Sequence, residues 1–165
     1  IVFRLKQTLE HGKADALSVL ETVEWLALGF EINDCIFPDW KFQPADIVAA
    51  FGFHTALVIG EPRPVEPAMI PSLAGQLSRF KLTLLKDGRL AEEGSGRNSL
   101  RSPALCLGEL AAAIARQPGA EPLAAGELIS SGTLTTPQPV SAGESWTASV
   151  EDLDLPSLTL RLSAN

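Results

Sequence analysis

Cysteine, basic residues and long hydrophobic runs are all scarce in this sequence. Cys35 and Cys106 are the two cysteines among 165 residues. They are too few for a disulfide framework and too far apart for a zinc motif, which favours a reducing, cytoplasmic setting. Lysine and arginine number 13 against 20 acidic residues, a net charge of -7, so the basic face that nucleic acid requires is missing. Charged residues, proline or glycine interrupt every apolar run before the roughly 20 residues of a membrane helix.

Several catalytic signatures are absent as well. The sequence has no GxSxG nucleophile elbow, no phosphate-binding loop, no GxGxxG fingerprint and no HExxH zinc motif. The nearest pattern is GSGRNS at 94–99, which follows a strand of a predicted hairpin and lacks the final glycine, so it indicates a turn. Since the net charge argues against nucleic acid, small molecules or other proteins are the partners that we expect.

What the sequence does contain is a series of short, regularly patterned segments. Helical spacing predicts helices at 13–27 and 102–120, and prolines predict irregular loops at 35–46 and 61–76. Alternation of apolar and polar residues predicts a hairpin at 80–96 and strands at 1–7, 28–34, 53–62, 127–134, 144–153 and 158–163. We predict an α+β fold in which a β-rich mixed sheet forms one β-sandwich-like roll with two or three covering helices.

Two local signals and the start of the chain refine this prediction. Asp87-Gly88 joins two alternating runs, and both residues tolerate the positive φ of a tight hairpin turn. Ser102 suits the N-cap of the second helix and Pro103 its first position. The chain opens at Ile1, without Met and already in strand-like alternation. We therefore predict a single domain over residues 1–165 that lacks its native N-terminal segment.

Glu31 is the strongest candidate for chemistry. It interrupts the run WLALGF at 25–30, which has the composition of a buried strand. A buried carboxylate is costly unless it is paired or bound to a metal. On a strand, Glu31 points to the face opposite Phe30 and Ile32. The residues alone leave three interpretations open: a solvent-facing side chain, an ion pair with a lysine, or a metal ligand.

The two histidines differ in context. His11 lies in a predicted loop and is interpreted as solvated. His54 opens the strand at 53–62, where its side chain could reach a pocket lined by Glu31. A structural histidine is the commoner alternative for such a residue.

Four segments together resemble one known family. The most specific is GELISSGTL at 126–134 with PVSAGE at 139–144, and EINDCIFPDW at 31–40 is nearly as specific. With ADIVAAFGFHTALVIGEP at 45–62 and KDGRLAEEGSGRNSLRSPALCLGELA at 86–111, they are similar to the 2-keto-4-pentenoate hydratase branch of the fumarylacetoacetate hydrolase superfamily. The resemblance covers nearly the whole chain.

The resemblance implies a metal-dependent site. In that family Mg²⁺ or Mn²⁺ is held by an E-x-E pair and a third carboxylate on a later strand. By resemblance Glu31 is the third ligand, and the E-x-E pair is expected immediately before Ile1. Such a cation suits a substrate that chelates through a carboxylate and an adjacent 2-oxo group. Gly132 and Thr133 match the position where the family binds the substrate carboxylate.

Two departures from the family pattern bear on mechanism. Ile36, preceded by Cys35, stands where family hydratases usually carry an arginine. Ala49, Ala50 and Phe51 lie where the family has Ala-Asp-Asn, and the apolar Phe51 predicts a drier pocket. We hypothesise that His54 supplies the lost acid or base function, since imidazole serves both roles near neutral pH.

Two functions follow from the resemblance and its departures. The first is a lyase or hydratase that acts on a small 2-oxo acid of the 2-hydroxy-dienoate type in aromatic catabolism, by hydration, decarboxylation or carbon-carbon cleavage. The second is a degenerate family member that binds a metabolite or serves as a partner subunit without chemistry. In either case we predict a homo-oligomer, because the family forms dimers or larger rings.

Overall fold

The computed structural model describes residues 1–10 and 15–163. Its helices are α1 (Ala16–Thr22), α2 (Pro44–Ala49), α3 (Ile70–Gln76) and α4 (Pro103–Ala115). Its strands are β1 (Val2–Leu5), β2 (Val23–Ala27), β3 (Gly29–Asn33), β4 (His54–Ile59), β5 (Arg63–Pro64), β6 (Lys81–Lys86), β7 (Arg89–Ser95), β8 (Leu128–Ser130), β9 (Ser145–Glu151) and β10 (Leu158–Arg161). This mixture confirms the α+β class. Among the described residues, no helix has the length and hydrophobicity needed to cross a membrane.

The described strands form two four-stranded sheets and a separate ribbon. One sheet has the order β5-β2-β1-β8, the second has the order β10-β9-β6-β7, and β3 pairs with β4. All of these pairings are antiparallel. Only the detail of one mixed sheet differs from the sequence prediction, because the described strands pair within three separate antiparallel sheets.

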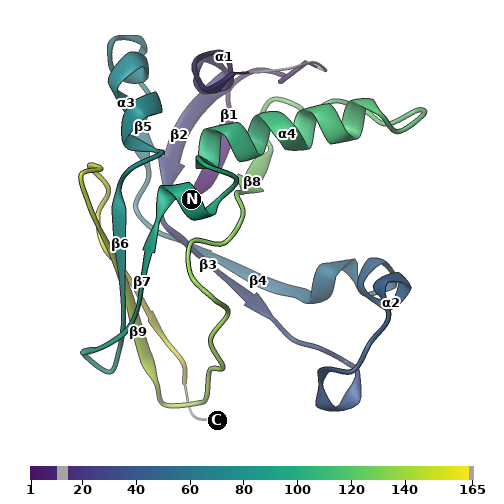
Figure 1. Ribbon diagram of the computed structural model, residues 1–165, viewed down its shortest axis with the longest axis vertical. Coiled ribbons are helices and arrows are strands. Elements are labelled where there is room, and N and C mark those ends of the chain that lie inside the picture. The colour runs from purple at the N-terminus through teal and green to yellow at the C-terminus, as the bar shows by residue number, and fades with distance from the viewer. Residues whose placement is uncertain (11–14, 164–165) are drawn as a thin grey trace.

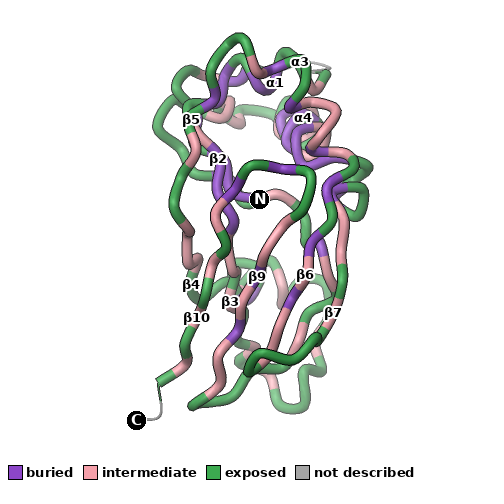
Figure 2. Tube along the Cα trace, turned by 90° about the vertical axis from the view of Figure 1, so that its left-hand side faces the viewer, coloured by how far each residue is buried: buried purple, intermediate pink, exposed green. Residues whose placement is uncertain are grey.

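The ribbon is an arm on an otherwise packed body. In Figure 1, α1, α3 and α4 gather around the first sheet, β6, β7 and β9 stand beside it, and the β3–β4 ribbon extends away with α2 near its tip. Figure 2 shows buried positions around α1, α4 and β2, and intermediate or exposed positions along β3 and β4. The core includes Phe3, Leu5, Phe80 and Leu107, each at most 1% exposed.

The first predicted helix ends earlier than its spacing indicated. The helix α1 stops at Thr22, and β2 continues directly from it as a partner of β1, with Leu5 opposite Val23 and Val2 opposite Ala27. Pairing with β1 overrides the local helical pattern, since β2 gains a ladder of hydrogen bonds and a buried face. The side chain of Asp15 accepts a hydrogen bond from the Ser18 amide at 2.9 Å at the helix start. His11 and the first residues predicted as helix, 13–14, lie outside the described residues.

The two proline-rich loops contain helices that the sequence analysis missed. The helix α2 begins at Pro44, and α3 carries Pro71 in its first turn. Proline is favourable at this position because it has a helical φ and the missing amide proton would have no helical partner there. Prolines that indicated irregular loops therefore start helices.

The predicted hairpin and the start of the second predicted helix are confirmed, but that helix ends at Ala115, before the predicted end at 120. Asp87 and Gly88 have φ values of 49° and 76° at the turn between β6 and β7. The helix α4 begins at Pro103 after Ser102. The Ser102 hydroxyl makes no capping hydrogen bond, however, and is buried without a hydrogen-bond partner.

Glu92 on β7 anchors the loop that follows β8. Its Oε1 accepts a hydrogen bond from the Thr136 amide at 3.1 Å, and its Oε2 accepts from the Thr136 hydroxyl at 2.6 Å and from Gln138 Nε2 at 2.7 Å. The hydrogen bonds from Thr136, and then that from Gln138, lower the pKa of Glu92 below its ordinary value of 4.5. A carboxylate with a lowered folded-state pKa stabilises the folded loop at neutral pH and loses that effect as the pH falls through the lowered pKa.

We expect Glu92→Gln to loosen this loop. The variant should lower the amide hydrogen-exchange protection of Thr136 several-fold at neutral pH, because charge-assisted hydrogen bonds become neutral ones. It should also remove the acid-dependent loss of protection that the wild type shows. Glu93→Gln, which changes an exposed neighbour on the same strand, is the matched control. Equal protection of Thr136 in wild type and Glu92→Gln at neutral pH would contradict the anchoring role.

Candidate functional site

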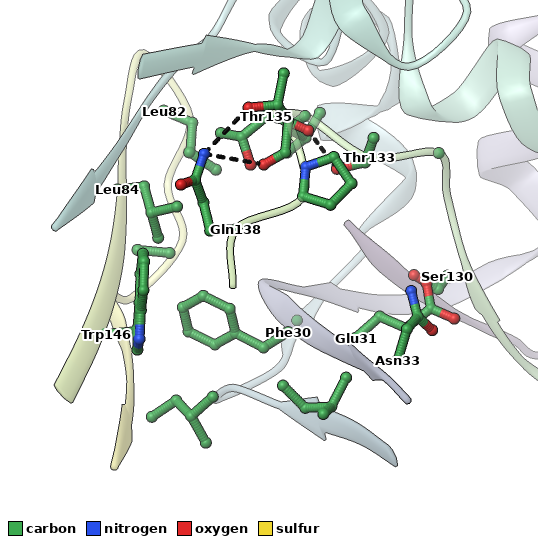
Figure 3. Close-up of a pocket in the computed structure, with 18 of the residues that line it drawn as sticks. Phe30, Glu31, Asn33, Leu82, Leu84, Ser130, Thr133, Thr135, Gln138 and Trp146 are labelled. Carbon is green, nitrogen blue, oxygen red and sulfur yellow. Dashed lines mark hydrogen bonds between the residues drawn. The ribbon is translucent and has the colours of Figure 1, made fainter. Parts of the chain in front are cut away.

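A cavity of about 390 Å³ lies between β3, strands β6 and β9, and the loop that follows β8. One side of it is polar and carries Glu31, Asn33, Ser130 and Thr133. The other side is apolar and includes Phe30, Leu82, Leu84 and Trp146 (Figure 3). The strand β3 contributes to both sides, because its successive side chains point in opposite directions.

Glu31 and His54 form a pair across the ribbon. The distance from Glu31 Oε1 to His54 Nδ1 is 3.0 Å, and the two side chains are 44% and 45% exposed. His54 lies opposite Asn33, and an irregularity in the pairing between Ile32 and Asn33 puts His54 on the same face as Glu31. The sequence-predicted pair is thus brought together, although His54 itself does not line the cavity.

The premise that Glu31 is buried is wrong. The strand β3 pairs with β4 in a two-stranded ribbon and contains no fully buried residue. The composition of the segment suggested a core strand, but strand composition does not reveal whether neighbouring strands cover it. Burial therefore does not require a metal at Glu31. Of the interpretations left open, the half-exposed carboxylate contacts a histidine and not a lysine.

Gly132 and Thr133 line the same cavity as Glu31. The Thr133 hydroxyl donates to the Thr135 carbonyl at 2.7 Å, and the Gly132 amide lies 3.4 Å from Cys106 Sγ. The hydroxyl proton of Thr133 must therefore turn away from Thr135 before it can bind a carboxylate. A Cβ at Gly132 would lie 3.3 Å from the hydroxyl oxygen of Ser99 and 3.7 Å from Cys106 Sγ, so a larger residue would crowd the packing of this loop against those two residues.

The described residues do not by themselves fit a divalent cation. No three His, Cys, Asp or Glu side chains among them are grouped closely enough to hold a metal ion. Mg²⁺ and related hard cations take about six oxygen ligands. Glu31 offers one carboxylate, and one of its oxygens already contacts His54. Glu31 stays a predicted ligand.

The apolar wall of the cavity escaped the sequence analysis. Leu82 and Leu84 alternate on β6, which predicts a shared face, but the pattern does not say that Trp146 and Phe30 complete that face. Phe51, expected to dry the pocket, is 87% exposed on the ribbon tip and does not line the cavity. That expectation is wrong, because Phe51 lies in a 3₁₀ turn beyond α2, at the far end of the ribbon.

Two curated enzymes are similar to this chain in sequence. A 2-hydroxyhexa-2,4-dienoate hydratase from Comamonas testosteroni is 32% identical over 155 residues, which cover 93% of this chain and 55% of the relative. A 4-oxalocrotonate decarboxylase from a Pseudomonas species is 31% identical over 153 residues, 93% of this chain and 56% of that protein. The chain thus spans about half the length of the curated relatives it matches. No protein-family model matches it.

The fold is shared with a solved structure. The 4-oxalocrotonate decarboxylase from Pseudomonas putida G7, complexed with magnesium and adipate, superposes with a TM-score of 0.83 at 23% identity. The match covers 98% of this chain and 57% of the decarboxylase. These similarities agree with the resemblance: over almost its whole length, this chain is similar in sequence to a hydratase and a decarboxylase. It shares its fold with the solved decarboxylase and with a yeast protein of the fumarylacetoacetate hydrolase family.

Proposed function

We propose that this chain carries the substrate site of a lyase that acts on a small 2-oxo acid. The observation that carries the proposal is the convergence of Glu31, Gly132 and Thr133, from distant parts of the sequence, on one cavity. The similarity to a hydratase and a decarboxylase supports it. Aromatic catabolism is the proposed pathway class, and the cytoplasmic setting stays a prediction.

Different residues of this chain would bind the substrate, transfer a proton and exclude water. Gly132 and Thr133 would orient the substrate carboxylate through an amide and a hydroxyl. When His54 Nδ1 carries its proton toward Glu31, Nε2 is left as a proton acceptor, so His54 would serve as a general base, and as a general acid once Nε2 is protonated. Because His54 does not line the cavity, it would reach the substrate through a bound water. The apolar side of the cavity would keep water away from the reacting carbons.

The proposed cofactor is a divalent cation, Mg²⁺ or Mn²⁺, with Glu31 as one of its ligands. A cation of this kind polarises a bound 2-oxo acid as a Lewis acid. Since the described residues offer a single carboxylate near His54, further ligands are required, and an E-x-E pair before Ile1 is the predicted source. The magnesium bound by the similar decarboxylase supports a metal-dependent family chemistry.

The alternative is a non-catalytic metabolite-binding or partner subunit. The incomplete ligand set among the described residues is the observation in its favour. Both curated relatives are enzymes, so the catalytic proposal is the better supported of the two. An E-x-E pair immediately before Ile1 in the full protein would agree with catalysis.

We expect oxalate, a mimic of the 2-oxo acid enolate, to bind the full protein only when Mg²⁺ is present. Glu31→Gln should weaken that binding by about tenfold or more, because an amide does not offer the cation a charge. Glu151→Gln, an exposed strand glutamate outside the cavity, should leave it unchanged. Isothermal titration calorimetry measures both. Oxalate binding that does not require Mg²⁺, or that has the same affinity in Glu31→Gln as in the wild type, would contradict a cation held by Glu31.

His54→Ala should slow turnover strongly without removing the binding site. We expect the rate of loss of the diene absorbance of 2-hydroxyhexa-2,4-dienoate to fall by about 10²-fold or more. Affinity for oxalate should remain close to that of the wild type, since His54 does not line the cavity. Thr55→Ala changes the exposed neighbour on β4 and serves as the control. Turnover at the wild-type rate in His54→Ala would eliminate the acid or base role.

The predicted homo-oligomer would use the tip of the ribbon. Ile36, Trp40, Val48 and Phe51, here called the tip patch, are 75%, 57%, 80% and 87% exposed. Trp40 and Phe51 also have φ values of 55° and 51°, which large side chains rarely adopt without support from their surroundings. Exposed apolar clusters of this kind commonly mark protein contacts.

We expect the double variant Val48→Asp, Phe51→Asp to lower the mass measured by light scattering after size exclusion, because two charges oppose burial of the tip patch. Leu90→Asp is the matched control, since Leu90 is 62% exposed on β7, away from the ribbon. A monomeric wild type, or an oligomer that both changes leave intact, would exclude this interface.

A further inference from the structure

We infer that the cavity selects 2-oxo acids with one carboxylate and an uncharged, apolar tail over dicarboxylic 2-oxo acids. The inference rests on the proposed function for the position of the 2-oxo acid head group. The nature of the tail follows from the far side of the cavity, which none of the predicted site residues occupies.

The far side carries an apolar wall, with Gln138 beside Leu82 and Leu84. In Figure 3, Leu82, Leu84 and Trp146 line one side, and Phe30 extends toward them from β3. Leu82 and Leu84 are each 6% exposed and Trp146 is 3% exposed, so the wall is part of the packed body. Glu31, Asn33 and Thr133 lie at the other side. A ligand whose head binds at Thr133 therefore extends its tail toward the wall.

The polar atoms near the wall already form hydrogen bonds or ion pairs with other protein groups. The Trp146 indole nitrogen donates to Glu144 Oε2 at 3.0 Å, which leaves the ring to face the cavity. Lys86 binds Glu144 Oε1 at 2.6 Å, and this contact is the first cause of the lowered pKa of Glu144. The cation nearest to the indole ring is thus engaged by a carboxylate.

Gln138 offers no better partner for a second carboxylate. Its amide nitrogen donates to Glu92 Oε2 at 2.7 Å and lies 3.1 Å from the Thr136 hydroxyl. A carboxylate placed beside Gln138 would have to displace these hydrogen bonds and would also meet the negative charge of Glu92. No lysine, arginine or histidine lines the cavity in the described part of the chain.

A carboxylate against this wall would lose its hydration without a compensating charge, whereas a methyl or methylene group gains from burial there. In an apolar pocket one methylene changes affinity by roughly tenfold or more. The wall therefore favours a substrate of the 2-hydroxy-alkadienoate kind, with one carboxylate, over one with a carboxylate at each end.

The first test compares 2-oxohexanoate with 2-oxoadipate, two acids of equal chain length, by calorimetry on the full protein with Mg²⁺. We expect 2-oxohexanoate to bind about tenfold tighter or more. Oxalate, which has no tail, reports the head group alone. Equal or tighter binding of 2-oxoadipate would overturn the inference while leaving the proposed function intact.

A second measurement needs no metal. The indole N–H signal of Trp146, assigned by its loss in Trp146→Phe, should shift with millimolar hexanoate and stay unchanged with adipate. If oxalate fails to bind with Mg²⁺ but this selective shift occurs, the proposed function fails and the apolar tail site stands. If the Trp146 signal does not shift with hexanoate, or shifts equally with adipate, the inference of an apolar tail site at this wall is wrong.

Val140→Arg should reverse part of the selectivity. Val140 lines the cavity and is 42% exposed, so an arginine there can keep its charge hydrated while it reaches a second carboxylate. We expect 2-oxoadipate to gain affinity relative to 2-oxohexanoate by about tenfold, with little change for oxalate. Val140→Gln, polar but uncharged, is the matched control. The same gain in Val140→Gln, or no gain in Val140→Arg, would contradict tail selection at this wall.

Discussion

The register of β1 between β2 and β8 is the constraint on which the site depends. Val2 pairs with Ala27 on one side and with Ser130 on the other. The end of β2, which leads into β3, and the end of β8, which leads into the loop at 131–140, therefore lie at the same end of the sheet. This places Glu31 and Thr133 on one cavity although about one hundred residues separate them. A slip of one residue in either pairing would turn the side chains to the opposite face.

Gly29 lets the ribbon leave the sheet at this point. A Cβ at Gly29 would lie 2.5 Å from Cγ2 of Val2, and Val2 is fully buried and has no room to move. The absence of a side chain allows β3 to start directly against β1. The same departure exposes both faces of β3, so that Glu31 meets His54 and Phe30 meets the apolar wall.

The two sides of the cavity are controlled by different parts of the structure. The polar side is built from the ribbon and the loop after β8, and Glu92 fixes that loop from β7. The apolar side belongs to the second sheet, where Lys86 and Glu144 hold the Trp146 indole. The polar and apolar sides of the cavity are therefore held in place by separate sets of interactions.

The sequence by itself determined the features that depend on neighbouring residues: the turn at Asp87-Gly88, the start of α4 at Pro103, and the family resemblance carried by its motifs. It misjudged β2 as helix, because pairing with β1 outweighs local propensity. It misjudged the segments of α2 and α3 as loops, because the prolines taken as helix breakers stand in the first turns of these helices. It proposed Glu31 but not its half-exposed setting or the contact of its Oε1 with Nδ1 of His54. Only the tertiary structure decided which side chains share the cavity, since these come from β3, β6, β9 and the loop after β8, and long-range register sets their distances.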